Sequence, residues 1–388
     1  MKKLIALLSL VSLVFGPGSA LATNTSATVG ATTTLTQDSG SGSAPIVKAK
    51  FETLRNSPLD DDTTLAGAQL NPSGQYKTDK QFRMCGVVTD PDGVADISNV
   101  YGDIWYPEET YLGPKHETGR QGCGQMVQTE CQMTKLTKQQ GYETFCGVYQ
   151  NNGTTDNSVQ TKNPNVTKFN TVGGTTNLYT YNEICKSDGE LMKETAYVYC
   201  CDRTLSYEDP SGDYEAIVYA QDNSGKSSYL LNNFTYTPTT AFETDFTSVS
   251  YGNVKLNTEK IINGDIPWTN DTPAGPLASV RNTGNTRLNV TVNQDDMGLG
   301  MTGSTYNVWY KARVGNNSVD WTTYVPNVTT TLAKSMDLSE TNEMDFAVNI
   351  TKFPPLANGS FGGHMTLGAV SAPHLTCEAY PNLDVSPR

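Results

Sequence analysis

The sequence predicts an all-β protein made of two β-sandwiches. Apolar and polar residues alternate over short runs, helical periodicity is scarce, and turn residues recur about every ten positions, a spacing typical of sandwiches. Thr, Tyr, Val, Asn and Gly dominate these runs. Removing an expected 22-residue leader from the 388 residues leaves 366, which is enough for two or three domains.

Residues 1–22 have the features of a secretory signal peptide. Two lysines follow Met1, residues 4–15 form an apolar run too short to span a bilayer, and the Ala-Leu-Ala at 20–22 fits the small-x-small cleavage rule. No later run approaches the ~20 apolar residues that a membrane helix needs. We therefore expect an exported protein, secreted or held at the cell surface, whose mature chain begins at Thr23 and has no membrane span.

Residues 23–45 form an N-terminal β-strand arm and its linker. Positions alternate between two faces over residues 23–37, the period-2 pattern of one half-buried strand. Residues 38–45 are rich in Gly and Ser, and such a linker is flexible and spans at most ~27 Å. A lone strand cannot satisfy its own backbone donors and acceptors, so the arm must pair with a sheet. The sequence leaves open whether that sheet belongs to the same molecule or to a neighbour.

Domain one is expected over residues 46–238. Its predicted strands cover residues 46–52, 82–88, 100–106 and 212–220. The last strand, the turn at 222–225 and a strand at 233–236 form a closing hairpin, which resembles the end of many immunoglobulin-like domains. Residues 107–202 are expected as a cysteine-rich insertion, in which disulfides staple segments with too few apolar residues for a core of their own.

Domain two is expected over residues 239–377, followed by a tail at 378–388. A strand at 278–286 runs into an Asn-x-Gly turn, residues 288–292 and 344–350 alternate, and a Gly-rich stretch precedes a strand at 367–370. This order resembles the CARDB-like sandwiches, adhesion-related domains of prokaryotic, including archaeal, surface proteins. The resemblance implies a fold and a location, and it brings no catalytic residues.

Eight cysteines in an exported chain favour disulfides over zinc. There is no CxxC pair, and the three histidines lack metal-site spacing to cysteine. Seven cysteines fall in domain one and one in domain two: Cys85, Cys123, Cys131, Cys146, Cys185, Cys200, Cys201 and Cys377. Because seven is odd, either Cys377 bridges the domains, or a thiol stays free, or a bond crosses between molecules. Cys200 and Cys201 adjoin in a strand and should take different partners.

The best candidate metal ligands are Asp90, Asp92 and Asp96, which could converge on calcium because this ion takes several carboxylate oxygens. The acidic run 60–62 could contribute. The alternative is that residues 90–93 are only a turn, in which Asp bonds its own backbone. No EF-hand spacing is present, and no other cofactor is expected.

Asn-x-Ser/Thr sequons occur at Asn152, Asn165, Asn233, Asn270, Asn289, Asn316, Asn327, Asn349 and Asn358. In a host that N-glycosylates they are candidate glycan sites, although a chain rich in Asn and Thr produces sequons by chance. The net charge of −13 argues against nucleic acid and anionic membrane surfaces as partners.

No catalytic signature is present. There is no Gly-x-Ser-x-Gly elbow, and Glu108 and Glu109 beside Trp105 are better explained as a solvated loop than as a glycosidase pair. Trp105, Trp268, Trp309 and Trp321 could form a sugar-binding platform, but in β-proteins such residues are more often core or cross-strand pairs. We therefore expect a protein that is not an enzyme.

The sequence favours a structural protein of the cell envelope, a subunit of a surface layer, sheath or filament. Its partners would be identical subunits, joined by strand addition of residues 23–37 and by disulfides. A secreted monomeric adhesin or carbohydrate-binding protein is the alternative, and a secreted hydrolase comes third.

Overall fold

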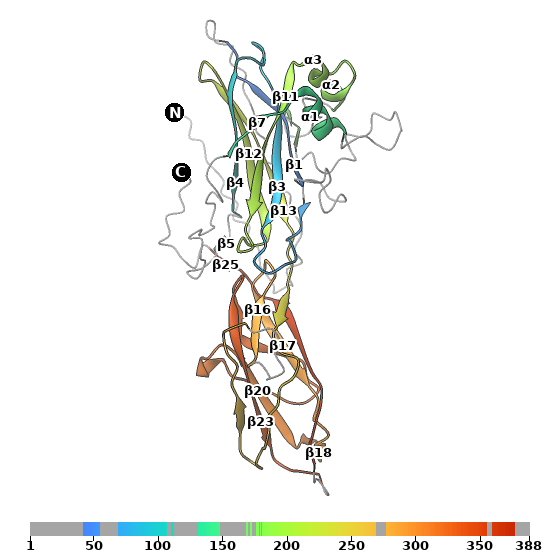
Figure 1. Ribbon diagram of the computed structural model, residues 1–388, viewed down its shortest axis with the longest axis vertical. Coiled ribbons are helices and arrows are strands. Elements are labelled where there is room, and N and C mark those ends of the chain that lie inside the picture. Colours follow the sequence, from blue (N-terminus) through green and yellow to red (C-terminus); the bar gives the residue numbers. More distant parts are fainter. Residues whose placement is uncertain are drawn as a thin grey trace, which may run out of the picture.

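The computed structural model describes residues 42–54, 69–106, 110–111, 131–147, 168–169, 171–172, 176–177, 179, 181–268, 277–354 and 359–376. Within them the chain forms two β-sandwiches stacked end to end, which confirms the predicted all-β class (Figure 1). The expected signal peptide and the N-terminal strand at 23–37 lie outside the described residues. No helix in the described part of the chain is long and apolar enough to cross a membrane.

Domain one has the strand arrangement of an immunoglobulin-like sandwich. One sheet has the order β7-β11-β3-β1-β8 and the other β2-β13-β12-β4-β6. The first contains β1 (Ile46–Leu54), β3 (Lys80–Thr89), β7 (Thr134–Lys135), β8 (Lys168–Phe169) and β11 (Ala196–Leu205). The second contains β2 (Gln69–Leu70), β4 (Ile97–Trp105), β6 (Cys131–Gln132), β12 (Gly212–Asp222) and β13 (Ser227–Tyr236). These orders correspond to the ABED and CFG sheets of immunoglobulin domains.

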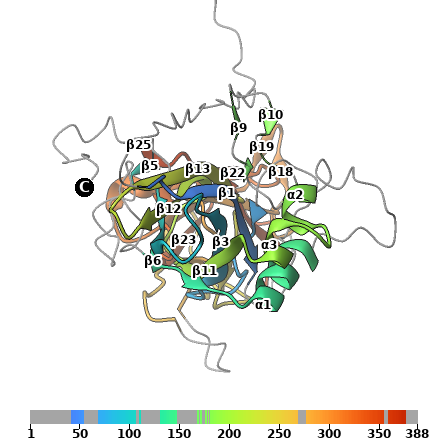
Figure 2. The same ribbon diagram turned by 90° about the horizontal axis from the view of Figure 1, so that it is seen from above.

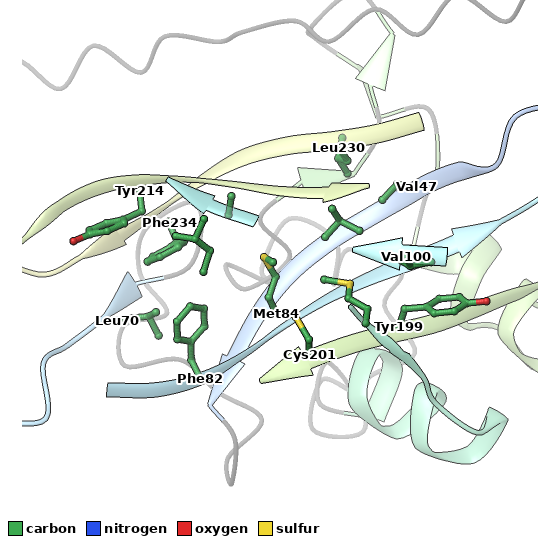
Figure 3. Close-up of a cluster of buried hydrophobic side chains, with 14 of the residues drawn as sticks. Val47, Leu70, Phe82, Met84, Val100, Tyr199, Cys201, Tyr214, Leu230 and Phe234 are labelled. Atoms are coloured by element: carbon green, nitrogen blue, oxygen red, sulfur yellow. The ribbon is translucent and has the colours of Figure 1, made fainter. Parts of the chain in front are cut away.

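The core of domain one lies between these two sheets. Tyr214 and Phe234 of the second sheet pack with Phe82 and Met84 of the first, and the ring centroids of Phe82 and Phe234 are 5.5 Å apart (Figure 3). The Tyr214 hydroxyl donates to the Pro210 carbonyl oxygen at 2.6 Å, the corner contact found near the start of the corresponding immunoglobulin strand. Strand alternation thus delivers the large apolar side chains to one shared interior.

The cysteine-rich insertion carries the three α-helices of the described chain, and a short 3-10 helix, η3 (Ser318–Asp320), lies in domain two. The insertion contains α1 (Lys138–Tyr142), the π-helical turn η1 (Glu143–Gly147), α2 (Tyr181–Cys185) and α3 (Glu190–Lys193), with short strands β5 (Thr110–Tyr111), β9 (Thr171–Val172) and β10 (Thr176–Asn177). The three helices gather on one side of the sandwich (Figure 2). There Phe145, Ile184 and Leu191 form a second core with Phe51 and Val87 of the sheet.

The expected end of the insertion near residue 202 needs correction. β11 begins at Ala196 and pairs with β3 over ten residues, so it is an inner strand of the sandwich. The segment between β4 and β11 therefore ends at Thr195, and its short strands β6, β7 and β8 pair with the sandwich sheets. Because Cys200 and Cys201 lie in this strand, the sequence favours assigning it to the cysteine-rich insertion. Its pairing with β3, more than 100 residues away, cannot be read from a local sequence pattern.

Domain two is a second sandwich with its own core. One sheet has the order β14-β16-β23-β20-β21, with β15 also paired to β23, and the other has the order β22-β17-β24. The first contains β14 (Phe242–Thr244), β15 (Lys260–Ile262), β16 (Ser279–Asn282), β20 (Val308–Val314), β21 (Thr322–Tyr324) and β23 (Thr341–Ile350). The second contains β17 (Leu288–Gln294), β22 (Thr330–Met336) and β24 (Met365–Ser371), and a small hairpin joins β18 (Met301–Thr302) to β19 (Thr305–Tyr306).

The two sandwiches meet at a hydrogen-bonded junction around Asn285, which is buried in the turn between β16 and β17. Its Nδ2 donates to the Thr237 carbonyl at 3.0 Å, and its Oδ1 accepts from the Thr239 N–H at 2.7 Å. Its carbonyl accepts from the Ser211 N–H at 2.9 Å. Because β12 and β17 both start here, each runs away from the junction, toward opposite outer ends of the molecule (Figure 1).

Candidate functional site

The outer end of domain one carries a cluster of carboxylates, which we call the acidic pole. Asp90 follows β3, Asp92 and Asp96 lie in the turn leading to β4, and Asp222 ends β12. One carboxylate oxygen from each of Asp90, Asp92 and Asp96 lies within 4.8 Å of the others. The structure therefore brings the three predicted ligands together. Residues 60–62 lie outside the described chain, and sequence reasoning missed Asp222, which only strand pairing places here.

Backbone hydrogen bonds hold the acidic pole in shape. Asp90 Oδ1 accepts from the Asp92 N–H at 2.8 Å, and the Asp90 carbonyl accepts from Gly93 N–H at 3.0 Å. Gly93 has a φ of +113°, which favours glycine. The Asp222 Oδ1 atom accepts from the Lys226 N–H at 2.7 Å in the turn between β12 and β13. The turn interpretation and the ligand interpretation of residues 90–93 are thus both compatible with the geometry.

Negative charge at the acidic pole is not balanced by any neighbouring side chain that the structure describes. No ion pair within the described residues involves Asp90, Asp92, Asp96 or Asp222. The Lys226 ammonium instead donates to the Gly42 carbonyl at 2.6 Å. Burial raises the pKa of Asp90 above its usual range, and the charges of Asp92, Asp96 and Asp222 raise it further.

The acidic pole is also the point at which the N-terminal arm joins domain one. The described chain starts at Gly42, at the end of the Gly/Ser linker, and Ser43 N–H donates to the Asp92 carboxylate. Ser228 then donates to the Pro45 carbonyl at 2.5 Å just before β1 begins. The described chain therefore enters domain one at its outer end, and not at the junction.

A free sheet edge lies in domain two. β24 pairs with β17 along all seven residues, and within the described chain it has no strand on its other side. The edges of domain one are partly covered, since β8, β7, β6 and β2 pair with β1, β11, β4 and β13. β22 also ends its sheet, but the Ala333 N–H donates to the Thr322 hydroxyl at 3.1 Å, beside β21. β24 is thus an edge strand whose second side is unpaired along all seven of its described residues.

A cleft of about 910 Å³ borders the outer half of β24, and we call this end of the molecule the cleft pole. The cleft opens between the two sheets of domain two and is flanked by the segment 246–254. Its apolar lining includes Val348, Ile350, Phe361, Met365 and Leu367. Gln294 lies at its inner end and accepts from the Tyr324 hydroxyl at 3.1 Å. A strand added to β24 would therefore place one face of its side chains over a cleft whose lining mixes these apolar residues with serine, threonine and glycine.

The other sequence candidates do not form a common site. Glu108 and Glu109 lie outside the described residues, and Trp105 is partly buried in β4. Trp268, Trp309 and Trp321 each lie against a cation of this chain, Arg281, Lys311 and Arg313 respectively, at 3.8, 5.2 and 4.7 Å. One face of each ring is thus in contact with a cation of the same chain, and the described contacts do not join the three rings into one platform.

The sequons differ in their surroundings. Asn233, Asn316 and Asn327 are exposed, as a glycan requires. Asn289 lies in β17, where its Nδ2 donates to the Leu332 carbonyl at 2.9 Å, so a glycan there would break this contact. Asn349 is only partly exposed in β23. Asn152, Asn165, Asn270 and Asn358 lie outside the described residues.

Three disulfides form within the described chain, and all belong to domain one. They join Cys85 to Cys200, Cys131 to Cys201 and Cys146 to Cys185. The prediction that Cys200 and Cys201 take different partners is confirmed. The first bond links β3 to β11 on the helix side, and the second lies among the core residues between the sheets. Cys123 and Cys377 lie outside the described residues.

No protein-family model matches the chain, and no curated protein matches it. Among solved structures, it is similar to a chaperone–tip adhesion subunit pre-assembly complex from the archaic chaperone-usher Csu pili of Acinetobacter baumannii. That match has 12% identity and a TM-score of 0.25, and covers 84% of this chain and 99% of that one.

Two further matches are equally remote. The C-terminal domain of the Streptococcus pyogenes antigen I/II-family protein AspA has 13% identity and a TM-score of 0.22, covering 85% of this chain and 99% of that one. A structure of carbohydrate-binding modules of the β-sandwich superfamily has 11% identity and a TM-score of 0.19, covering 86% and 97%. At these scores the similarity says nothing about ligands or partners, and the resemblance of domain two to CARDB-like sandwiches stays a prediction.

Proposed function

We propose that this protein is an exported structural subunit of the cell envelope that assembles head to tail by β-strand addition. In this proposal the arm of one copy, residues 23–37, pairs with the free edge of β24 in the next copy. The observation that carries it is that the arm joins domain one at the acidic pole, whereas the free edge borders the cleft pole at the other end. Main-chain hydrogen bonds along such an edge give affinity, and side-chain pockets give specificity.

The reach of the arm favours the β24 of a neighbouring copy over the β24 of its own chain. β12 spans the length of domain one with eleven residues, which corresponds to roughly 33 Å. An arm returning to its own β24 would have to cover that distance fully extended, which uses about ten residues before the first pairing. Counting back from Gly42, these ten residues comprise the linker and the last six residues of the arm, which could then not pair with β24. In an end-to-end neighbour, β24 is available directly beyond the linker.

The side chains of the arm suit the cleft. One face of residues 23–37 carries Ala27, Val29, Ala31, Thr33 and Leu35, and the other carries mainly threonine. A strand lying along β24 directs alternate side chains to opposite faces. The apolar face would cover the cleft beside Leu367, and the threonine face would meet solvent.

The rest of the molecule supports an extracellular structural role. Three disulfides stabilise domain one, and such bonds persist in oxidising compartments. A contact between different surfaces of identical copies that does not close into a ring propagates as a filament. A surface layer or sheath would need additional lateral contacts between such filaments.

Deleting residues 23–37 tests the proposal. Mature protein should form filaments visible by negative-stain electron microscopy, and the deletion variant should elute as a monomer in light-scattering chromatography with an unchanged circular dichroism spectrum. Val29→Asp with Ala31→Asp should also abolish assembly, because it puts charge on the cleft-facing side. The matched control, Thr28→Asp with Thr32→Asp on the other face, should still assemble.

Two outcomes contradict the proposal. Filaments formed by the deletion variant would show that the arm does not join subunits. A mature wild-type protein that stays monomeric would favour the solitary adhesin or carbohydrate-binding protein instead, for which the cleft beside β24 would be the place to seek a ligand.

A further inference from the structure

The acidic pole gathers carboxylates that form no ion pair within the described residues. Asp90, Asp92 and Asp96 come from the turn between β3 and β4. Asp222, whose charge also acts on Asp90, is brought near by its pairing with Ile97 at the start of β4. Like charges this close repel one another unless a positive charge or protons intervene. The ammonium of Lys226, four residues after Asp222, is directed to the Gly42 carbonyl.

The buried carboxylate of Asp90 gives an independent indication of a ligand. Asp90 is only 5% exposed, and its Oδ2 atom is inaccessible to solvent and has no hydrogen-bond partner, whereas Oδ1 accepts from Asp92 N–H. A buried carboxylate oxygen left without a donor is unfavourable, and such atoms are rare in native proteins. A metal ion is a partner that would satisfy Oδ2 together with the exposed Asp92 and the half-buried Asp96.

The spacing of the oxygens suits calcium. Ca²⁺ binds oxygens at 2.3–2.6 Å, so ligand atoms around it are separated by up to about 5 Å. The three carboxylate oxygens lie within 4.8 Å of one another, inside that limit. Mg²⁺ binds at 2.0–2.1 Å and demands near-ideal octahedral geometry, whereas Ca²⁺ accepts irregular sets of carboxylate and water oxygens.

We propose that Asp90, Asp92 and Asp96, with Asp222 as a further carboxylate beside them, bind one Ca²⁺ ion. Because Asp92 is exposed, water completes the coordination shell on the outer side. Asp92 also accepts from Ser43 N–H, so the bound ion stiffens the point from which the N-terminal arm departs. The site rests on the acidic pole alone and stands whether or not the arm joins subunits.

Calcium titration of the mature protein after EDTA treatment tests the site. Isothermal titration calorimetry should detect one Ca²⁺ per chain with sub-millimolar affinity, in the range of extracellular calcium modules, and at least tenfold weaker Mg²⁺ binding. Asp96→Asn should weaken Ca²⁺ binding at least tenfold. The matched control Asp188→Asn, an exposed acid elsewhere in domain one, should bind like the wild type.

The thermal stability of the Asp90→Asn variant, measured with and without calcium, shows whether Asp90 is a calcium ligand or only stabilises the turn. Without calcium this substitution should leave the Tm unchanged or raise it, because it removes a charge from a repelling cluster. With calcium it should lower the Tm relative to the wild type, since the ion loses its buried ligand. The proposal is overturned if Ca²⁺ produces no binding heat, if Asp96→Asn binds as tightly as the wild type, or if Asp90→Asn lowers the Tm equally under both conditions.

Discussion

Lys50 and Glu52 form an ion pair with both side chains fully buried in β1. Burial lowers the pKa of Lys50 by penalising its charged form, and the neighbouring Glu52 carboxylate opposes that effect. Placing two charges in an interior costs free energy, and their attraction offsets it only while both partners are present. Each buried charge is therefore tolerated only while the other side chain is present.

We predict that removing one partner of this pair is more harmful than removing both. Glu52→Leu should lower the free energy of unfolding by about 3–5 kcal/mol, because it leaves an uncompensated buried ammonium. The double variant Lys50→Met with Glu52→Leu should recover most of this loss. Urea unfolding followed by tryptophan fluorescence measures both values. A double variant as unstable as the single one would show that the pair is not energetically coupled.

Single residues also show how far the sequence predicts the sites. Asp90, Asp92 and Asp96 could be chosen from the sequence because they lie within seven positions of each other in one turn. Asp222 could not, since it reaches them only through the pairing of β12 with β4. The unpartnered Asp90 Oδ2 is a property of burial, which no local pattern encodes.

At the scale of elements, alternation predicted the strands that contribute most of the core. β1, β3, β4, β12, β13, β17, β23 and β24 all contain residues chosen from their period-2 pattern. β20 was missed although Val308, Tyr310, Ala312 and Val314 alternate with partly exposed residues along it. The short helices of the insertion carry too few turns for a helical period, and they form a core only through their packing on β3 and β11. The free edge of β24 exists because no other strand pairs with it in the described chain, and a local sequence pattern cannot predict this.

The strand pair β5–β25 leads to a prediction about the last cysteines. β25 (Leu375–Thr376) pairs with β5, with Thr376 opposite Thr110, so the C-terminal strand lies against the insertion of domain one. With six cysteines paired, Cys123 and Cys377 remain. We expect them to bond to each other within one chain.

Peptide mapping without reduction checks this pairing. A linked peptide containing Cys123 and Cys377 is the expected product, and gels of the native material should show no disulfide-linked dimer. A dimer that reduction converts to monomer would instead place Cys377 in a bond between molecules, the alternative that the sequence left open.

At the scale of the whole molecule, the two ends differ, so the protein has a defined polarity along its long axis. The junction around Asn285 orders the domains end to end, so the acidic pole and the cleft pole face away from each other. The sequence predicted two sandwiches and an arm in need of a partner. It could not predict the partner, because that choice depends on the distance between the arm's origin and the free edge, a quantity set by the assembled fold.

The most direct test of this assembly is a cross-link from the arm. A photoreactive benzoylphenylalanine replaces Val29, and unlabelled copies are mixed with ¹⁵N-labelled copies before assembly and irradiation. Mass spectrometry should then find Val29 joined to β24 or the cleft lining, around Leu367, in peptides that mix the two labels. Cross-links found only between peptides of the same label, or joining Val29 to the sheets of domain one, would contradict head-to-tail strand addition.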